Sequence, residues 1–187
     1  APHSVRDRME MQLLASHFSV DRIGVDDGSV SVIRTTAPGA GERLRRNILG
    51  QSRLWAYGIS GDLPLAVVSV ADSQGLALAR EVLIAHTYWR LHGLKVDLVI
   101  LNREPASYER PLYYELLRLA EAHSLHTGID QPGGVFLRNT DQIPEEDINL
   151  ILAAAQATLG MARGLLSKQL GSSPEGTPLP PPLAMRK

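Results

Sequence analysis

Apolar and polar positions are distributed unevenly along the chain, and the regular part begins near residue 65. Leu65–Val70 and Val96–Leu101 are short, almost continuous apolar runs, and Val135–Leu137 is a shorter run of the same kind. Runs of this length, rich in Val, Ile and Leu, are typical of strands buried on both faces of a parallel sheet. The pattern therefore predicts three short buried strands.

An amphipathic helix is expected after each of the first two strands. Leu76–His92 carries two adjacent apolar rows, so its buried face should be wide. Asp72 or Ser73 offers a side-chain oxygen as its N-cap, and Gly93 can adopt the left-handed conformation that ends such a helix. The second helix is expected over Pro111–His123, because proline is well tolerated in a first helical turn.

The third helix is expected to begin at Pro144. The acidic residues 145–147 follow it and would complement the positive end of the helix dipole. Its apolar face continues at helical spacing as far as Leu159, and Leu165–Leu170 would add a last turn or two. We interpret the three acidic residues as a capping cluster.

This order of elements predicts an α/β fold: a small three-layer βαβαβα unit with a short, mainly parallel sheet. The strand order is left open between 2-1-3 and 3-2-1. We expect residues 1–46 to form a weakly structured N-terminal connecting segment, with a short helix at Arg6–His17 and a brief strand at Ser29–Ile33. Residues 47–170 would form the α/β domain, and the Pro-rich residues 171–187 a disordered linker or tail.

Composition narrows the class of protein. The chain has 187 residues, 44% of them hydrophobic and 21% charged, which is an ordinary globular balance. Its net charge of −1 argues against a nucleic-acid-binding surface. The absence of cysteine excludes disulfides, thiolate nucleophiles and cysteine-based zinc sites, and no apolar run is long enough to cross a membrane. Because the chain begins Ala1-Pro2 without methionine, we expect it to be a piece of a longer protein.

Polar residues follow the predicted strands where each strand ends. Asp72 follows the first, Asn102 and Glu104 follow the second, and Asp141 follows the third. The carboxyl ends of parallel strands meet at one edge, where ligands bind in open α/β sheets. Helix caps and loop residues in any such fold are also polar, however. Two interpretations stay open: a site for a sugar or nucleotide-sugar, or a set of structural caps.

Motifs for catalysis are missing. The loop after the first strand, ADSQG, has one glycine where dinucleotide and phosphate loops need more. Gly58–Asp62 differs from a nucleophile elbow in its glycine spacing and precedes a strand instead of following it. The six histidines include no i, i+4 pair of the kind that binds zinc on a helix. We therefore predict no catalytic residue, no metal ligand and no cofactor.

Trp55, Tyr57 and Asp62 form the most conspicuous aromatic and polar group in the sequence. Exposed aromatic rings often stack on sugar rings, and a nearby carboxylate can bond sugar hydroxyls. Large aromatic residues beside an apolar strand are more often core or interface anchors. The basic residues of the preceding segment have a similar structural explanation as a solvated helix face; they are Arg43, Arg45, Arg46 and Arg53.

Three strings in the sequence resemble one region of the cyclic β-1,2-glucan synthases. They are GQSRLWAYGISGDLPLAVV, AHTYWRLHGLKVDLVILN and QPGGVFLRNTDQIPEEDINLILAAAQ. These synthases are very large bacterial membrane proteins that join a glycosyltransferase module to a glycoside phosphorylase-like module. The matching blocks run in unbroken order from Asn47 to Leu170. Arg53, where the family has a small residue, and Ile23–Gly41 depart from the family pattern.

The resemblance implies a fragment of such a carbohydrate-active enzyme, lying between its modules at the cytoplasmic side of the bacterial inner membrane. It carries over no catalytic residue, so it implies a structural or glucan-contacting segment that is soluble as a fragment. The implied partners are the neighbouring modules of the same polypeptide and β-1,2-glucan, with no nucleic acid and no membrane insertion by this segment. The alternative is a free-standing α/β module that binds a sugar or nucleotide-sugar at the strand ends.

Overall fold

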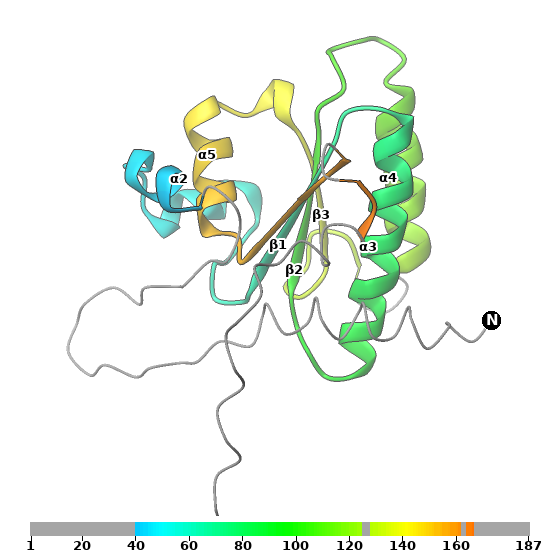
Figure 1. Cartoon of the computed structure of the whole chain (residues 1–187), viewed down its shortest axis with the longest axis horizontal. Coiled ribbons are helices and arrows are strands. Elements are labelled where there is room, and N and C mark those ends of the chain that lie inside the picture. Colours follow the sequence, from blue (N-terminus) through cyan, green and yellow to red (C-terminus); the bar gives the residue numbers. More distant parts are fainter. Residues whose placement is uncertain (1–39, 125–127, 162–163, 167–187) are drawn as a thin grey trace, which may run out of the picture.

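The structure is a computed structural model, and it describes residues 40–124, 128–161 and 164–166. Several expected elements lie outside these residues: the helix at Arg6–His17, the strand at Ser29–Ile33, most of the last helical turns at Leu165–Leu170, and the tail 171–187. The described residues form one sheet with helices on both of its faces (Figure 1).

Four strands make up the sheet: β1 (Leu65–Val70), β2 (Asp97–Asn102), β3 (Val135–Asn139) and β4 (Ala157–Gly160). Their spatial order is β3-β2-β1-β4, and all three neighbouring pairs are parallel. The predicted α/β class and the parallel sheet are confirmed. Of the two strand orders that the sequence left open, the structure has 3-2-1, extended by a fourth strand beside β1.

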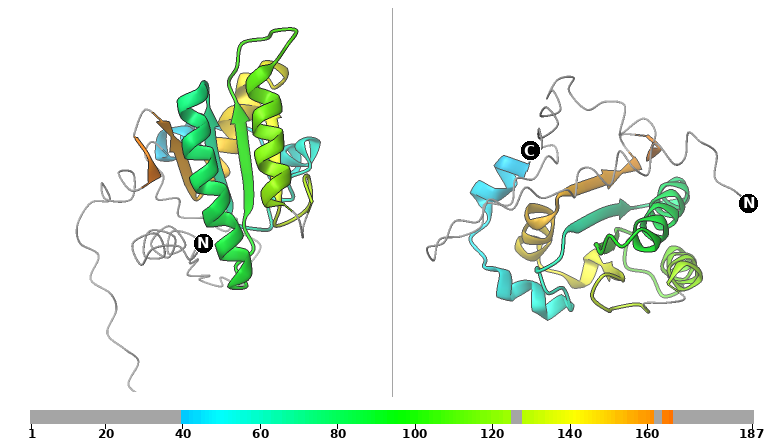
Figure 2. Two further views of the ribbon diagram at one scale, coloured as in Figure 1. Left: turned by 90° about the vertical axis from the view of Figure 1, so that its right-hand side faces the viewer. Right: turned by 90° about the horizontal axis from the view of Figure 1, so that it is seen from below.

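Two groups of helices enclose the sheet. On one face lie α3 (Ser73–Leu91) and α4 (Pro111–His123); on the other lie α5 (Glu145–Ala154), the 3-10 helix η1 (Gln51–Tyr57) and, outside α5, α2 (Ala40–Arg46). Figure 2 shows α3 and α4 side by side and the sheet between the two helical layers. The connections β1-α3-β2-α4-β3 stay on one face, and the connection through α5 crosses to the other side of β1.

The core is divided by the sheet, because successive residues of a strand point to opposite faces. Ala66, Val68 and Val70 of β1 belong to the apolar cluster beneath α3 and α4. Leu65 and Val67 belong to the cluster beneath η1 and α5. All five residues are buried, which explains why β1 is apolar at every position except Ser69.

The expected third helix is shorter than its apolar spacing indicated. It ends at Ala154, and Ala155 already has an extended backbone with ψ of 131°. Gln156 then pairs with the first residue of β1: its N–H donates to the Leu65 carbonyl at 2.9 Å, and its side-chain carbonyl accepts the Leu65 N–H at 2.5 Å. The following residues form β4, so the prediction of a helix through Leu159 is wrong.

Gly75 explains the close approach of α3 to β1. A Cβ atom at this position would lie 2.8 Å from Val70 Cγ1 and 3.2 Å from Val70 Cα, too close for any larger residue without movement of the helix. The single glycine of the ADSQG loop therefore serves packing. At the other end, Gly93 has φ of 81°, the left-handed conformation expected where the helix stops.

Candidate functional site

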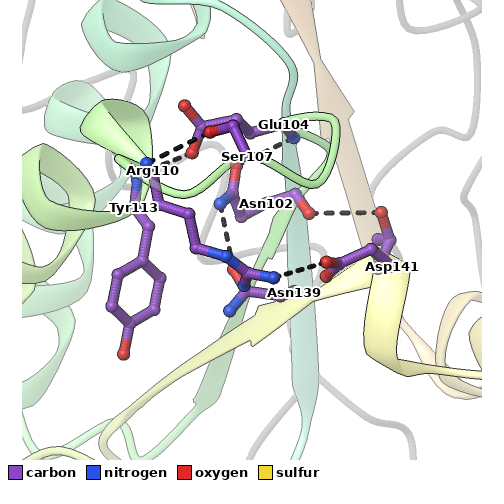
Figure 3. A network of polar contacts seen from close by, with 8 residues as sticks. Asn102, Glu104, Ser107, Arg110, Tyr113, Asn139 and Asp141 are labelled. Carbon is purple, nitrogen blue, oxygen red and sulfur yellow. Dashed lines mark hydrogen bonds and ion pairs between the residues drawn. The ribbon is translucent and has the colours of Figure 1, made fainter.

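The carboxyl edge of the sheet carries a network of polar contacts between β2 and β3 (Figure 3). The buried Asn102, at the end of β2, donates from Nδ2 to Asn139 Oδ1 at the end of β3, 2.9 Å away. Its backbone carbonyl accepts the hydroxyl of Thr140 at 3.2 Å. Asn102 thus joins two neighbouring strand ends, as its place after a buried strand indicated, and its amide is occupied in doing so.

Glu104 uses both carboxylate oxygens on the first turn of α4. Oε1 accepts the N–H of Leu112 at 3.1 Å and Oε2 accepts the N–H of Tyr113 at 3.2 Å. These N–H groups have no partner within the helix, and a carboxylate also complements the positive end of the helix dipole. Glu104 therefore caps α4 from a distance of several residues along the chain.

Arg110 closes the network. Its guanidinium donates at 2.6 Å to Oδ2 of Asp141, which lies in the short 3-10 helix η2 (Thr140–Gln142) (Figure 3). Its backbone has φ of 41° and ψ of 53°, a left-handed conformation that residues other than glycine rarely adopt, and its N–H donates to Ser107 Oγ at 3.1 Å. The ion pair and this hydrogen bond hold the loop between β2 and α4 in place.

Asp72 lies apart from this network, after β1. Its Oδ1 accepts the Gly75 N–H at 2.9 Å, so it is the N-cap of α3, one of the two residues predicted for that role. Of the polar residues at the carboxyl edge, Asn102, Glu104 and Asp141 belong to the network between β2 and β3, and Asp72 does not. Asp72, Asn102, Glu104 and Asp141 each have a partner within the protein, which holds the side chain in a structural contact.

Trp55 and Asp62 are brought together at a second place, in η1 and the loop after it. Trp55 is 64% exposed, and its indole N–H donates to the Ser60 carbonyl at 3.1 Å. The side-chain amide of Gln51 donates to the same carbonyl at 3.0 Å and to Asp62 Oδ1 at 3.3 Å. Trp55 is therefore not a core residue, because its ring lies largely in solvent, and the alternatives of an interface anchor and a sugar contact both need an exposed ring.

Tyr57 points away from this group and toward α5. Its hydroxyl donates to Asp147 Oδ2, and the Arg53 Nε–H donates to both oxygens of the same carboxylate at 3.0 and 3.1 Å. The Asp147 side chain is fully buried. The hydrogen bond from Arg53 holds the pKa of Asp147 below its usual range, and burial followed by Asp147 itself raises the pKa of Tyr57 to about 12.

This arrangement corrects two interpretations of the charged residues. The acids 145–147 do occupy the first turn of α5, but none of their side chains makes a capping hydrogen bond, and Asp147 turns into the core. Arg53 is not simply part of a solvated basic face, since its guanidinium binds Asp147, whereas Arg45 and Arg46 pair with Glu42 at the surface.

Two buried titratable residues were not singled out by the sequence. Asp97 begins β2, and its Oδ1 accepts the Gly133 N–H at 2.6 Å, while Oδ2 has no hydrogen-bond partner within the described residues. Burial, and to a lesser extent the charge of Asp62, raises its pKa. His86 of α3 has Nε2 2.8 Å from the Val96 carbonyl, and burial lowers its pKa to about 4. A polar residue inside an apolar run was the available signal for Asp97.

Comparison with known proteins identifies the family to which the chain is related. Over 130 residues, or 69% of its length, the chain is 31% identical to the cyclic β-(1,2)-glucan synthase NdvB of Rhizobium meliloti (strain 1021). The chain is a relative of the cyclic β-1,2-glucan synthases. It spans only 5% of the length of that protein, and no family model matches the chain.

Within residues 40–124, 128–161 and 164–166, no three His, Asp or Glu side chains are grouped so that they could hold a metal ion. None of the helices in these ranges is long and apolar enough to cross a membrane. A surface hollow of about 360 Å³ between α3 and α4 is lined by none of the predicted site residues; it is formed by Leu76, Arg80, Glu115, Arg118 and Leu119.

Proposed function

We propose that the chain is a non-catalytic segment of a larger cyclic β-1,2-glucan synthase-like protein. In this proposal it lies between carbohydrate-active modules, on the cytoplasmic side of the bacterial inner membrane, and supports them mechanically. Its similarity to one short segment of NdvB supports the parent family. In this proposal, other modules of the parent protein carry out catalysis.

The single observation that carries the non-catalytic role is the self-contained pairing at the carboxyl edge. Asn102 binds Asn139, Glu104 binds the first turn of α4, and Arg110 binds Asp141. A substrate that displaced these internal partners would have to replace their hydrogen bonds, each worth about 0.5–3 kcal/mol in context. General acids and bases are more often held ready beside an open cleft. These residues instead fasten loops to strand ends.

Turnover assays on the whole purified chain test this role. We expect neither transfer of glucose from a nucleoside diphosphate glucose nor phosphorolysis of β-1,2-glucooligosaccharides above a protein-free blank. The paired variant is Asp141→Asn, which removes the charge that Arg110 binds. Any turnover of the wild-type chain that Asp141→Asn reduces at least tenfold would overturn the proposal.

The alternative function, binding of a nucleotide-sugar at the strand ends, is tested by thermal unfolding in the same buffers. A bound ligand raises the unfolding temperature in proportion to the logarithm of its concentration. We expect no shift with a nucleoside diphosphate glucose. A saturable shift that disappears in Asp141→Asn would favour the alternative.

Sequencing the DNA that flanks the coding region tests whether the chain is part of a longer parent protein. We expect the reading frame to continue on both sides of the segment that encodes residues 1–187. A start codon directly before Ala1 together with a stop codon directly after Lys187 would show a free-standing protein and contradict the proposal.

A further inference from the structure

The indole ring of Trp55 is both exposed and fixed in orientation. An exposed tryptophan normally keeps its N–H free to bond water or a partner. Here the N–H is used internally, on the Ser60 carbonyl 3.1 Å away, while 64% of the residue stays accessible. What Trp55 offers to solvent is therefore an apolar ring whose polar atom is already satisfied.

The segment that carries this ring is anchored from below. Leu54 and Ile59, on either side of it, are buried beneath α5 and the sheet. Gly58 and Gly61 have φ of 74° and 76°, so the chain can fold back beneath the ring at two points. A Cβ atom at Gly61 would lie 2.8 Å from the Gln51 side chain, which shows how closely the loop fits η1. A ligand would meet a surface that is already formed.

Polar groups that suit hydroxyls lie beside the ring. The Gln51 amide nitrogen bonds the Ser60 carbonyl and Asp62 Oδ1, and the Asp62 N–H donates to Ser60 Oγ at 3.1 Å. Within the described residues, no hydrogen bond reaches the side-chain carbonyl oxygen of Gln51 or Oδ2 of Asp62. Both residues are exposed, so these two acceptor oxygens face solvent.

We propose that Trp55, Gln51 and Asp62 form a saccharide-binding surface for a glucan chain. The indole face takes the C–H face of one pyranose ring, and the free oxygens of Gln51 and Asp62 accept hydrogen bonds from its hydroxyl groups. A pyranose has such an apolar face bordered by hydroxyl donors, and a purely apolar protein surface does not. This inference rests on the proposed function, because it takes the ligand class from a glucan-handling parent protein.

Tryptophan fluorescence can follow this surface directly. The chain has two tryptophans, and Trp89 is 1% exposed while Trp55 is 64% exposed. Iodide in solution should therefore quench Trp55 and leave Trp89 almost untouched. On titrating the whole chain with β-1,2-glucooligosaccharides, we expect a saturable blue shift and a fall of at least twofold in the iodide quenching constant. β-1,4- and α-1,4-glucooligosaccharides at the same concentrations report linkage preference.

Variants locate the binding by native electrophoresis in gels that contain β-1,2-glucan. We expect glucan to retard the wild-type chain, Trp55→Ala to abolish the retardation, and Gln51→Ala and Asp62→Asn each to raise the dissociation constant threefold to tenfold. Tyr108→Ala is the control, because Tyr108 is an aromatic residue that is even more exposed than Trp55 and lies in the loop after β2. Circular dichroism melting checks that each variant is folded.

Several outcomes would overturn the inference. Neither retardation nor protection from iodide would mean that Trp55 does not meet glucan, and the proposed non-catalytic role would be unaffected. If Tyr108→Ala abolished the retardation and Trp55→Ala did not, the glucan-binding site would lie at the carboxyl edge of the sheet and not at Trp55. Self-association that buries Trp55, seen as dimers by sedimentation in the wild-type chain and as monomers in Trp55→Ala, would assign the surface to protein contact.

Discussion

His86 is a buried histidine that the fold keeps neutral. Its ring is 1% exposed, donates to the Val96 carbonyl, and meets the Trp89 ring edge-to-face with centroids 6.2 Å apart. Burial opposes a positive charge here, and nearby Arg90 opposes it further, so the pKa falls from 6.5 to about 4. The unfolded chain can therefore bind a proton at pH values where the folded chain cannot.

Because of this difference in the pKa of His86 between the folded and the unfolded chain, we expect the free energy of unfolding to fall as the pH is lowered. Because the folded pKa is depressed, the contribution of His86 is fully present above pH 6.5 and is lost as pH falls toward 4, by about 3 kcal/mol in total. Urea unfolding at pH 7.5, 5.5 and 4.5 measures it. His86→Gln keeps an N–H donor for the Val96 carbonyl but does not titrate, so it should lose less stability over this range. Equal losses in the two proteins would contradict the assignment.

At the scale of elements, the short 3-10 helix η1 depends on side chains from elsewhere in the chain. Helices of this type have strained hydrogen bonds and are rarely stable alone. Asp147 of α5 accepts hydrogen bonds from Arg53 and Tyr57 of η1, and Arg138 of β3 donates to the Tyr57 carbonyl at 2.6 Å. These contacts fasten η1, and with it the Trp55 surface, to the sheet.

Removing one hydroxyl should loosen that attachment. In Tyr57→Phe the buried Asp147 carboxylate loses a donor, which should lower the free energy of unfolding by about 1–3 kcal/mol. Tyr114→Phe is the control, because Tyr114 is 57% exposed and its hydroxyl makes no hydrogen bond within the described residues. Its expected effect is within about 0.5 kcal/mol. Chemical unfolding that ranks the two variants equally would show that the Asp147 contact does not stabilise η1.

Elements whose pattern is local were predictable, and elements that depend on a distant partner were not. β1 and α4 have the bounds that their apolar periodicity, and for α4 its leading proline, indicated. β4 was not predictable, because Leu159 fits a helical row as well as a strand, and only the free edge of β1 decides between them. In the site, Asp72 was identified as an N-cap from neighbouring residues. The Tyr57–Asp147 contact joins residues 90 positions apart, and neither residue type specifies the other.

For the whole molecule, the position of each strand in the sheet predicts its resistance to opening. β2 lies between β1 and β3, and all six of its residues are buried. α2 lies at the outside of the molecule, is seven residues long and ends in exposed arginines. Local opening costs least where few groups are buried.

Hydrogen exchange followed by mass spectrometry can test this ranking. We expect the amides of β1 and β2 to exchange on the order of a hundredfold more slowly than those of α2, since the former open only with the whole sheet. Peptides from β3 should fall between them, because this strand has one strand neighbour within the described sheet. Equal protection of α2 and β2 would mean that the molecule opens as a single unit.

The position of β1 between β2 and β4 also determines how long one of its edges stays unpaired during translation. Among the four strands of the described sheet, β1 is synthesised first, yet one of its edges pairs with β4, so Ala66 has no partner until Ala157 has been made. A ribosome must add roughly ninety further residues before that edge can be covered. During this interval the nascent chain presents a bare, apolar strand, and unpaired strand edges of this kind attract other chains. Fast translation through the codons for residues 70–160, or a chaperone bound to β1, would shorten or shield the exposure.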